Sequence, residues 1–222
     1  MKRTGLIAVA LVLLVGSAAA FAWTEKLKLE PARVSKPQFD RHFSPTCNCH
    51  RATSSLSFVL ERGQRIDVSV VDVDGDHVAT LASGQAEPAG RVRLAWDGRT
   101  DDGLIAPDGI YRLKVRLQAE RRTILIPSTI HVDTSAPELR DVVVEGAQTG
   151  SGLVIRYASD ETARPLLKLD GKIVFRGERR HPGNARLRWE GPLPPGSHEA
   201  VLVLVDQAGN RSQPSQPVTV GG

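Results

Sequence analysis

The chain has 222 residues, of which 41% are hydrophobic and 24% charged, and its formal net charge is +4. This composition excludes an intrinsically disordered chain and allows one large domain or two small ones. Aromatic residues make up only 5% of the chain, which argues against a protein that stacks many bases or sugars on rings.

The N-terminus has the pattern of an export segment. Lys2 and Arg3 precede an uncharged, largely apolar run of 18 residues from Leu6 to Trp23. Small residues in 18–22 fit a signal-peptide cleavage site, and the run is just long enough to span a membrane. Residues 1–23 are therefore either a signal peptide or a membrane anchor. Both alternatives make the rest of the chain extracytoplasmic, either anchored by this segment or secreted after cleavage.

The next segment combines a spacer with the two cysteines of the chain. Residues 24–45 mix charged residues with three prolines and are interpreted as an extended spacer. In an exported protein Cys47 and Cys49 face an oxidising compartment, so we expect a local disulfide between them. The alternatives are bonds to other partners, or a metal-binding or redox role together with His42 and His50. Because one residue is missing from the C-x-x-C-H spacing, we do not expect covalently attached haem.

Apolar and polar residues alternate in short runs from residue 54 onward. A period of two between turn signals indicates half-buried antiparallel strands. In the first half the predicted strands are 55–60, 66–71, 91–96 and 110–118, with Asp-Gly turns at 74–75, 97–98, 102–103 and 108–109.

The second half repeats this pattern after a short stiff link at residues 133–137. The predicted strands are 139–145, 153–159, 166–169, 172–176, 185–189, 198–206 and 217–220. Asp170-Gly171 is a typical two-residue hairpin turn. Two such strand sets predict an all-β chain with two antiparallel β-sandwich domains in tandem.

The turn motifs of the first half resemble the FlgD-type immunoglobulin-like domain. They are Val68–Asp76 (VSVVDVDGD), Val78–Leu81 (VATL), Trp96–Gly103 (WDGRTDDG) and Pro107–Tyr111 (PDGIY), in the order and spacing of that family. The resemblance covers about residues 43–133. The hook-capping role of the flagellar member is not implied, because the rest of that protein has no counterpart here.

Two further motifs resemble bacterial Ig-like surface repeats. Val132–Pro137 is similar to the start of such a repeat, and Asp206–Asn210 (DQAGN) to its closing turn. The two resemblances imply a FlgD-type Ig-like domain at residues 46–133 and a second Ig-like domain at 134–222.

Cationic residues alternate with core positions on two of the predicted strands. They are Arg91 and Arg93 on one strand and Arg112, Lys114 and Arg116 on the other. If these strands pair, the five residues form one surface that binds an anionic cell-envelope polymer or a membrane surface. The alternative is an ordinary solvated face. The same two interpretations apply to a second cluster, Arg176, Arg179, Arg180, Arg186 and Arg188.

Other conspicuous residues are interpreted as structural. The acidic runs Asp72, Asp74 and Asp76, and Asp97, Asp101 and Asp102, are predicted to shape turns, because no Glu closes a calcium-binding loop. Trp96, Tyr111 and Trp189 are expected in the cores.

The sequence carries no catalytic motif of the G-x-S-x-G or H-E-x-x-H type, so we expect no enzyme, catalytic residue, metal site or cofactor. The predicted function is that of a non-enzymatic surface protein with a structural, adhesive or binding role, and an envelope protein is a second kind of expected partner. The alternative is an accessory subunit that binds an anionic envelope polysaccharide for a partner enzyme. Export excludes nucleic acid as a partner.

Overall fold

The computed structural model describes residues 13–18, 21, 33–145, 151–193 and 195–221. Most of the predicted signal peptide or anchor, residues 1–23, lies outside this description. Residues 13–18 are helical. Within the described ranges, no helix has both the length and the apolar character needed to cross a membrane.

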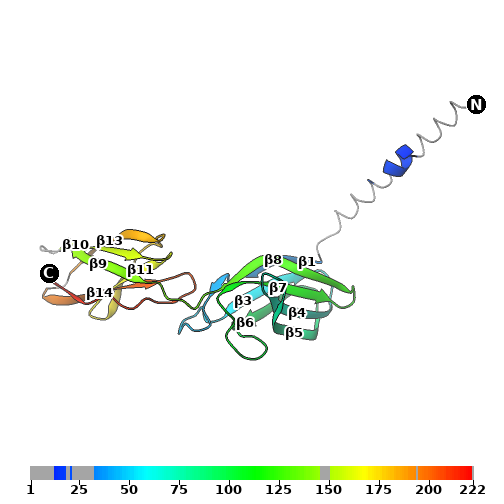
Figure 1. The fold of residues 1–222 in the computed structure, drawn as a ribbon, viewed down its shortest axis with the longest axis horizontal. Helices are drawn as coiled ribbons and strands as arrows, with labels where there is room; N and C mark the ends of the chain where they lie inside the picture. Colours follow the sequence, from blue (N-terminus) through cyan, green and yellow to red (C-terminus); the bar gives the residue numbers. More distant parts are fainter. Residues whose placement is uncertain (1–12, 19–20, 22–32, 146–150, 194, 222) are drawn as a thin grey trace, which may run out of the picture.

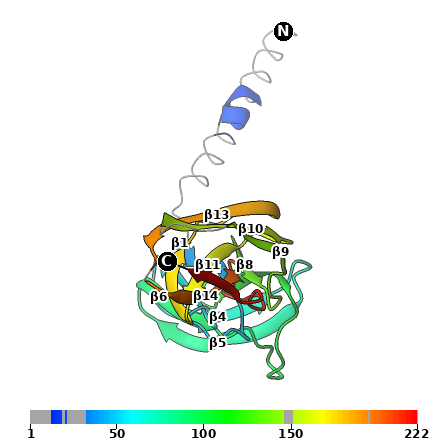
Figure 2. The same ribbon diagram turned by 90° about the vertical axis from the view of Figure 1, so that its left-hand side faces the viewer.

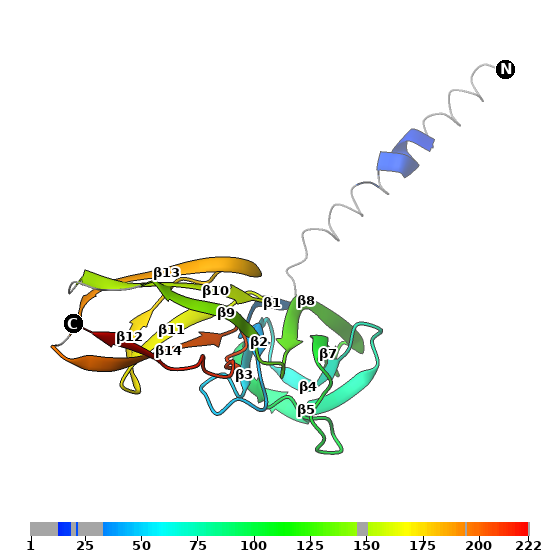
Figure 3. The same cartoon turned by 60° about the vertical axis from the view of Figure 1, so that its left-hand side comes forward.

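The strands form two bodies that lie end to end, with β1–β8 in one and β9–β15 in the other (Figures 1 and 3). The first sandwich, residues 34–132, packs a three-stranded sheet against a five-stranded sheet. The smaller sheet has the order β1 (Val34–Phe39), β3 (Ser54–Leu60) and β6 (Gly90–Trp96). The larger sheet has the order β2 (His42–Phe43), β8 (Arg122–Val132), β7 (Gly109–Leu117), β4 (Gln64–Val71) and β5 (His77–Glu87).

The second sandwich, residues 139–221, packs a three-stranded sheet against a four-stranded one. Its sheets are β13 (Gly183–Pro192), β10 (Ser151–Ser159) and β9 (Leu139–Glu145), and β12 (Lys172–Arg176), β11 (Arg164–Leu169), β14 (Ser197–Val205) and β15 (Val218–Gly221). Seen end-on in Figure 2, the two sandwiches lie one behind the other. The predicted fold class, two tandem Ig-like β-sandwiches, is confirmed.

Alternation of side chains explains how each sheet finds its core. On β7, Tyr111, Leu113 and Val115 are buried, whereas Arg112 and Lys114 between them point to the other face. Most of the buried apolar residues of the two sheets belong to one hydrophobic cluster in each sandwich. Trp96 and Tyr111 lie in the first cluster and Trp189 in the second, as predicted.

The predicted spacer contains strands. Residues 34–39 of the 24–45 segment form β1, which pairs with β3, and residues 42–43 form β2. The pairing of β1 is irregular between Ser35 and Gln38, where Lys36 has a φ of 49° and Pro37 follows it. An edge strand tolerates charged residues, and tolerates proline at a bulge. Because these residues interrupt the apolar alternation, the sequence did not indicate a strand here.

Two long strands of the first sandwich were also missed in whole or in part. The strand β8 contains Pro127, which is exposed and lies where the pairing with β7 is irregular, between residues 125 and 129. The other edge of β8 is paired only at residues 131–132, with β2. Of β5, only residues 78–81 were recognised, as part of the FlgD-type motifs, because Gly84 and the irregular pairing with β4 break its alternation.

Candidate functional site at the junction of the sandwiches

A disulfide loop lies where the two sandwiches meet. Cys47 and Cys49 are bonded to each other, with their Cα atoms 5.3 Å apart. Gly209, in the turn after β14, packs against this loop with a φ of 102°, and a Cβ atom at this position would lie 2.6 Å from the Cys49 Sγ. The loop of the first sandwich and the DQAGN turn of the second therefore fit together only because residue 209 has no side chain.

Two side chains bond across the junction. Arg51 donates from Nη1 to the carbonyl oxygen of Gln207 at 2.9 Å and to that of His42 at 3.3 Å. In the other direction, the Asn210 side-chain amide donates to the Asp133 carbonyl oxygen at 2.9 Å. Asn210 is 7% exposed, so this contact is largely shielded from water. These bonds fix the second sandwich against the end of the first.

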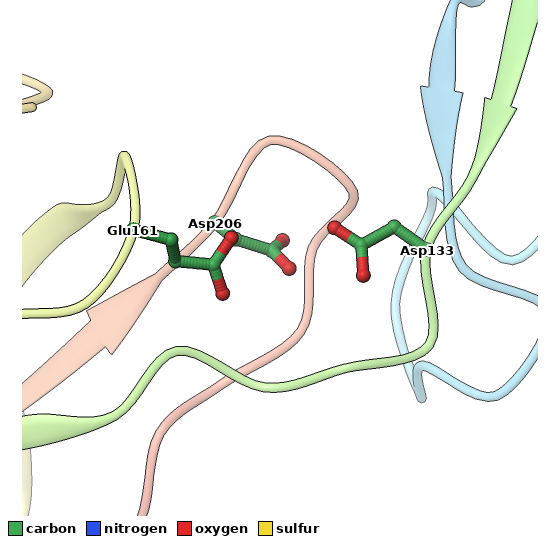
Figure 4. Close-up of side chains that lie close together, drawn as sticks. All are labelled: Asp133, Glu161 and Asp206. Atoms are coloured by element: carbon green, nitrogen blue, oxygen red, sulfur yellow. The ribbon is translucent and has the colours of Figure 1, made fainter. Parts of the chain in front are cut away.

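Three carboxylates converge at the same place. Asp133 follows β8, Glu161 lies in the turn after β10, and Asp206 follows β14. One oxygen of each lies within 4.8 Å of the others, and Figure 4 shows the three groups pointing toward one another. Asp206 is buried and accepts from the backbone N–H groups of Gly209 and Asn210 and from the Asn210 side chain.

The crowding of these acids alters their protonation. Burial raises the pKa of Glu161 to about 7, and the charges of Asp206, Asp133 and Asp160 act in the same direction. Burial also raises the pKa of Asp133, against the hydrogen bond from the Ser135 N–H, and the charge of Asp206 adds to the rise. Glu161 therefore holds a proton in part of the population near neutral pH.

Chemically, the cluster can share a proton between carboxylates or offer oxygens to a hard cation. Ca²⁺ takes about 6–8 oxygen ligands, of which the three carboxylates supply a minority. Beside the cluster is a hollow of about 530 Å³, whose lining includes Asp133, Asp160, Glu161, His42 and His131.

The two histidines of this hollow stack on each other, with ring centroids 4.6 Å apart. Burial lowers the pKa of His42, and the neighbouring His131 and the charges of nearby arginines act in the same direction. A neutral His42 at neutral pH follows from this environment.

The predicted five-cation surface does not exist as one patch. Arg91 and Arg93 lie on β6, which pairs with β3, whereas Arg112, Lys114 and Arg116 lie on β7, which pairs with β4 and β8. The core-facing residues of both strands meet in one cluster, so the cationic residues point outward on opposite sides of the sandwich. The premise that the two strands pair was therefore wrong.

Each half of that set has local partners. Arg91 donates to the side chains of Gln38 and Ser57. Arg116 stands directly opposite Asp67 on β4, and its charge contributes to a lowered pKa of Asp67, after the hydrogen bonds from the Gly84 N–H and Gln118. The cationic residues of β7 therefore have an acidic neighbour on the adjacent strand β4.

The Asp side chains of the acidic turns accept hydrogen bonds from nearby backbone N–H groups, as the sequence indicated. Asp72 accepts from the N–H groups of Asp74 and Asp76 at 3.0 and 2.9 Å. Asp101 accepts from the Thr80 N–H and from His77, both at 2.7 Å. These bonds are typical of turns stabilised by Asp.

The second arginine cluster divides in two. Arg186 and Arg188 pair with Glu145 and Glu190, and Arg180 pairs with Glu178. Arg176 and Arg179 instead line a separate pocket at the junction.

Sequence reasoning missed the junction itself. Asp133 and Asp206 each lie within one of the two repeat-like motifs of the sequence. No short-range signal indicated that three positions so far apart in the chain would meet.

The comparisons with known proteins found distant similarities to solved structures and a match to one family model. Fibronectin(III)-like modules of Clostridium thermocellum CbhA align with 84% of this chain and 93% of theirs, at 16% identity and a TM-score of 0.47. The human OSCAR ligand-binding domain aligns with 84% of this chain and 99% of its own, at 13% identity and a TM-score of 0.38. The search of curated proteins found no match. Residues 46–120 match the family model of the FlgD Ig-like domain, so the resemblance seen in the turn motifs is confirmed and the first sandwich contains a module of the binding or structural kind.

Proposed function

We propose that the chain is a non-enzymatic extracytoplasmic protein with a structural or binding role, exported or anchored by its N-terminal segment. The junction carries this proposal. Arg51, Asn210 and Gly209 join the two Ig-like sandwiches end to end through specific contacts, as suits a unit that presents a surface at a set distance.

Two features support the extracytoplasmic part of the proposal. The sequence begins with a charged start and an apolar run of export type. The bonded cysteines of the junction suit an oxidising compartment, since cytosolic thiols are normally kept reduced.

The alternative, an accessory subunit that binds an anionic envelope polysaccharide, loses the surface that motivated it. Arg91 and Arg93 lie on the opposite side of the first sandwich from Arg112, Lys114 and Arg116, so the five residues do not form one binding surface for a polymer. The alternative is retained only through a different pocket, which is lined by Arg51, Arg164, Arg176, Arg179 and Arg211.

Location is tested on cells stripped of outer layers, using an amine-reactive biotin reagent that does not cross the cytoplasmic membrane. Exposed lysines such as Lys36 and Lys172 should be labelled without lysis, while a cytosolic control protein is not. Labelling that appears only after lysis would contradict the proposal.

The thiols provide a second test on the purified full chain. Without reductant, an alkylating reagent should add no mass, because both cysteines are bonded to each other. With reductant it should add two alkyl groups. Uptake of two groups without reductant would argue for a reducing compartment.

A further inference from the structure

Five arginines line one pocket at the junction. The pocket has a volume of about 400 Å³, within the range of small-ligand sites. Arg51 comes from the loop after β2, Arg164 from β11, Arg176 from β12, Arg179 from the connection to β13, and Arg211 from the segment after β14. Residues from both sandwiches thus bring positive charge to one place.

Few carboxylates balance the positive charge of the arginines in this pocket. Among the described residues of its lining, Asp206 is the single carboxylate, and it is 3% exposed and bonded to Gly209 and Asn210. Of the ion pairs between described residues, none includes any of the five arginines. By contrast, Arg156, Arg186 and Arg188 of the same sandwich all have glutamate partners.

The arginines are near enough to repel one another. The pKa of Arg179 is lowered by burial and then by the charges of Arg164 and Arg51, with Asp206 acting in the opposite direction. Like charges gathered without counter-charge weaken a folded protein, and a bound anion relieves that repulsion. One of the five, Arg51, is held in place by its bonds to His42 and Gln207, so part of the pocket is preorganised.

We propose that this pocket binds a phosphate-bearing ligand between the two sandwiches. Guanidinium groups donate paired, planar hydrogen bonds that match phosphate oxygens. A phosphate group accepts from several directions at once, as an arrangement of donors from five segments requires, whereas a single carboxylate is satisfied by two such groups. The proposal concerns the chemistry of the pocket and does not depend on the compartment in which the chain works.

The test compares the full chain with two variants of equal net charge. The first replaces Arg164, Arg179 and Arg211 with Gln. Arg51 is kept, because it bonds across the junction. The control replaces Arg156, Arg186 and Arg188 with Gln, which removes three paired arginines of the same sandwich. Circular dichroism verifies that all three proteins fold.

Pyrophosphate is the probe, with sodium chloride at the same ionic strength as reference. Titration calorimetry should detect binding to the wild type and the control, with a dissociation constant at least about tenfold higher in the pocket variant. The thermal midpoint of the wild type should rise with pyrophosphate and not with chloride. Equal responses of both variants, or an effect of pyrophosphate no larger than that of chloride, would overturn the proposal.

Binding to vesicles distinguishes a lipid headgroup from a soluble or polymer-borne phosphate as the ligand. Retention of the wild type but not the pocket variant on phosphatidic acid vesicles assigns the site to lipid headgroups. Pyrophosphate binding without such retention assigns it to a soluble or polymer-borne phosphate. Failure of both arms rejects the site, while the biotin labelling described above would still decide the proposed location independently.

Discussion

At the scale of single residues, Trp96 ties three parts of the first sandwich together. It is 1% exposed, and its ring makes edge-to-face contacts with Phe43 and Tyr111 at centroid distances of 5.5 and 5.1 Å. The indole N–H donates to the Arg99 carbonyl oxygen at 2.9 Å. The ring therefore contributes both apolar packing and a satisfied polar group.

Replacing Trp96 with Ala should lower the free energy of unfolding of the first sandwich by about 3–5 kcal/mol, because the cavity cannot close fully. Chemical denaturation of the full chain measures the loss. Leu104→Ala is the control, since Leu104 is 67% exposed and should cost less than about 0.5 kcal/mol. A loss below about 1 kcal/mol for Trp96→Ala would contradict a core role.

Glu161 is the residue whose titration reports on the junction. Its folded-state pKa, about 7, lies above the ordinary glutamate value of 4.5. Between these two values the folded chain binds more protons at this site than the unfolded chain, so this group makes stability fall as pH rises from about 4.5 through 7. The penalty is complete above that range and absent below it.

Glu161→Gln should remove this penalty. The variant is expected to be more stable than the wild type at pH 8 and to differ little at pH 4, with the thermal midpoints converging as pH falls. Glu138→Gln, at an exposed position with a partner outside the cluster, is the matched control and should show no such convergence. A constant difference between Glu161→Gln and wild type at every pH would exclude the linkage.

At the scale of elements, periodicity predicted most strands correctly, and the reason is visible in β7 and β3. Both strands alternate between core and outer face without interruption. The strand β1 was read as spacer because an edge strand tolerates proline and exposes polar side chains. Pairing order was beyond local pattern, since nothing in residues 91–93 or 112–116 specifies which neighbour each strand takes. The acidic cluster and the arginine pocket could not be predicted from the sequence for the same reason, because both are assembled from turns that lie far apart in the chain.

The turn after β14 makes a sharper prediction. Gly209→Ala combines a positive φ with a clash against the Cys49 Sγ, whereas Gly75→Ala has a φ of 91° with no atom within 4 Å of the added Cβ. Both should lose stability through backbone strain. Only Gly209→Ala should also speed cleavage of the link at residues 134–138 by a protease of broad specificity. Equal cleavage rates would show that the clash is absorbed elsewhere.

At the scale of the whole molecule, each sandwich has a hydrophobic cluster of its own, and polar contacts hold the two together. Arg51→Ala combined with Asn210→Ala removes two of these contacts. The variant should widen the distribution of interdomain distances in small-angle X-ray scattering while each sandwich stays folded. Arg65→Ala is the control, because Arg65 donates to the Gly84 carbonyl oxygen within one sandwich. An unchanged scattering profile of the double variant would mean that other contacts fix the junction.

The parallel pairing of β2 with β8 has a mechanical consequence. Around this pair, the His131 N–H donates to the Arg41 carbonyl oxygen at 2.6 Å, and the Asp133 N–H to that of Phe43 at 3.2 Å. When the chain is pulled from its two ends, tension draws β2 backward and β8 forward, so these bonds are sheared together rather than opened one after another. In the second sandwich, the first strand β9 and the last strand β15 belong to different sheets and share no such ladder. Under load, the second sandwich should therefore extend first, and the sandwich nearer the N-terminus should hold.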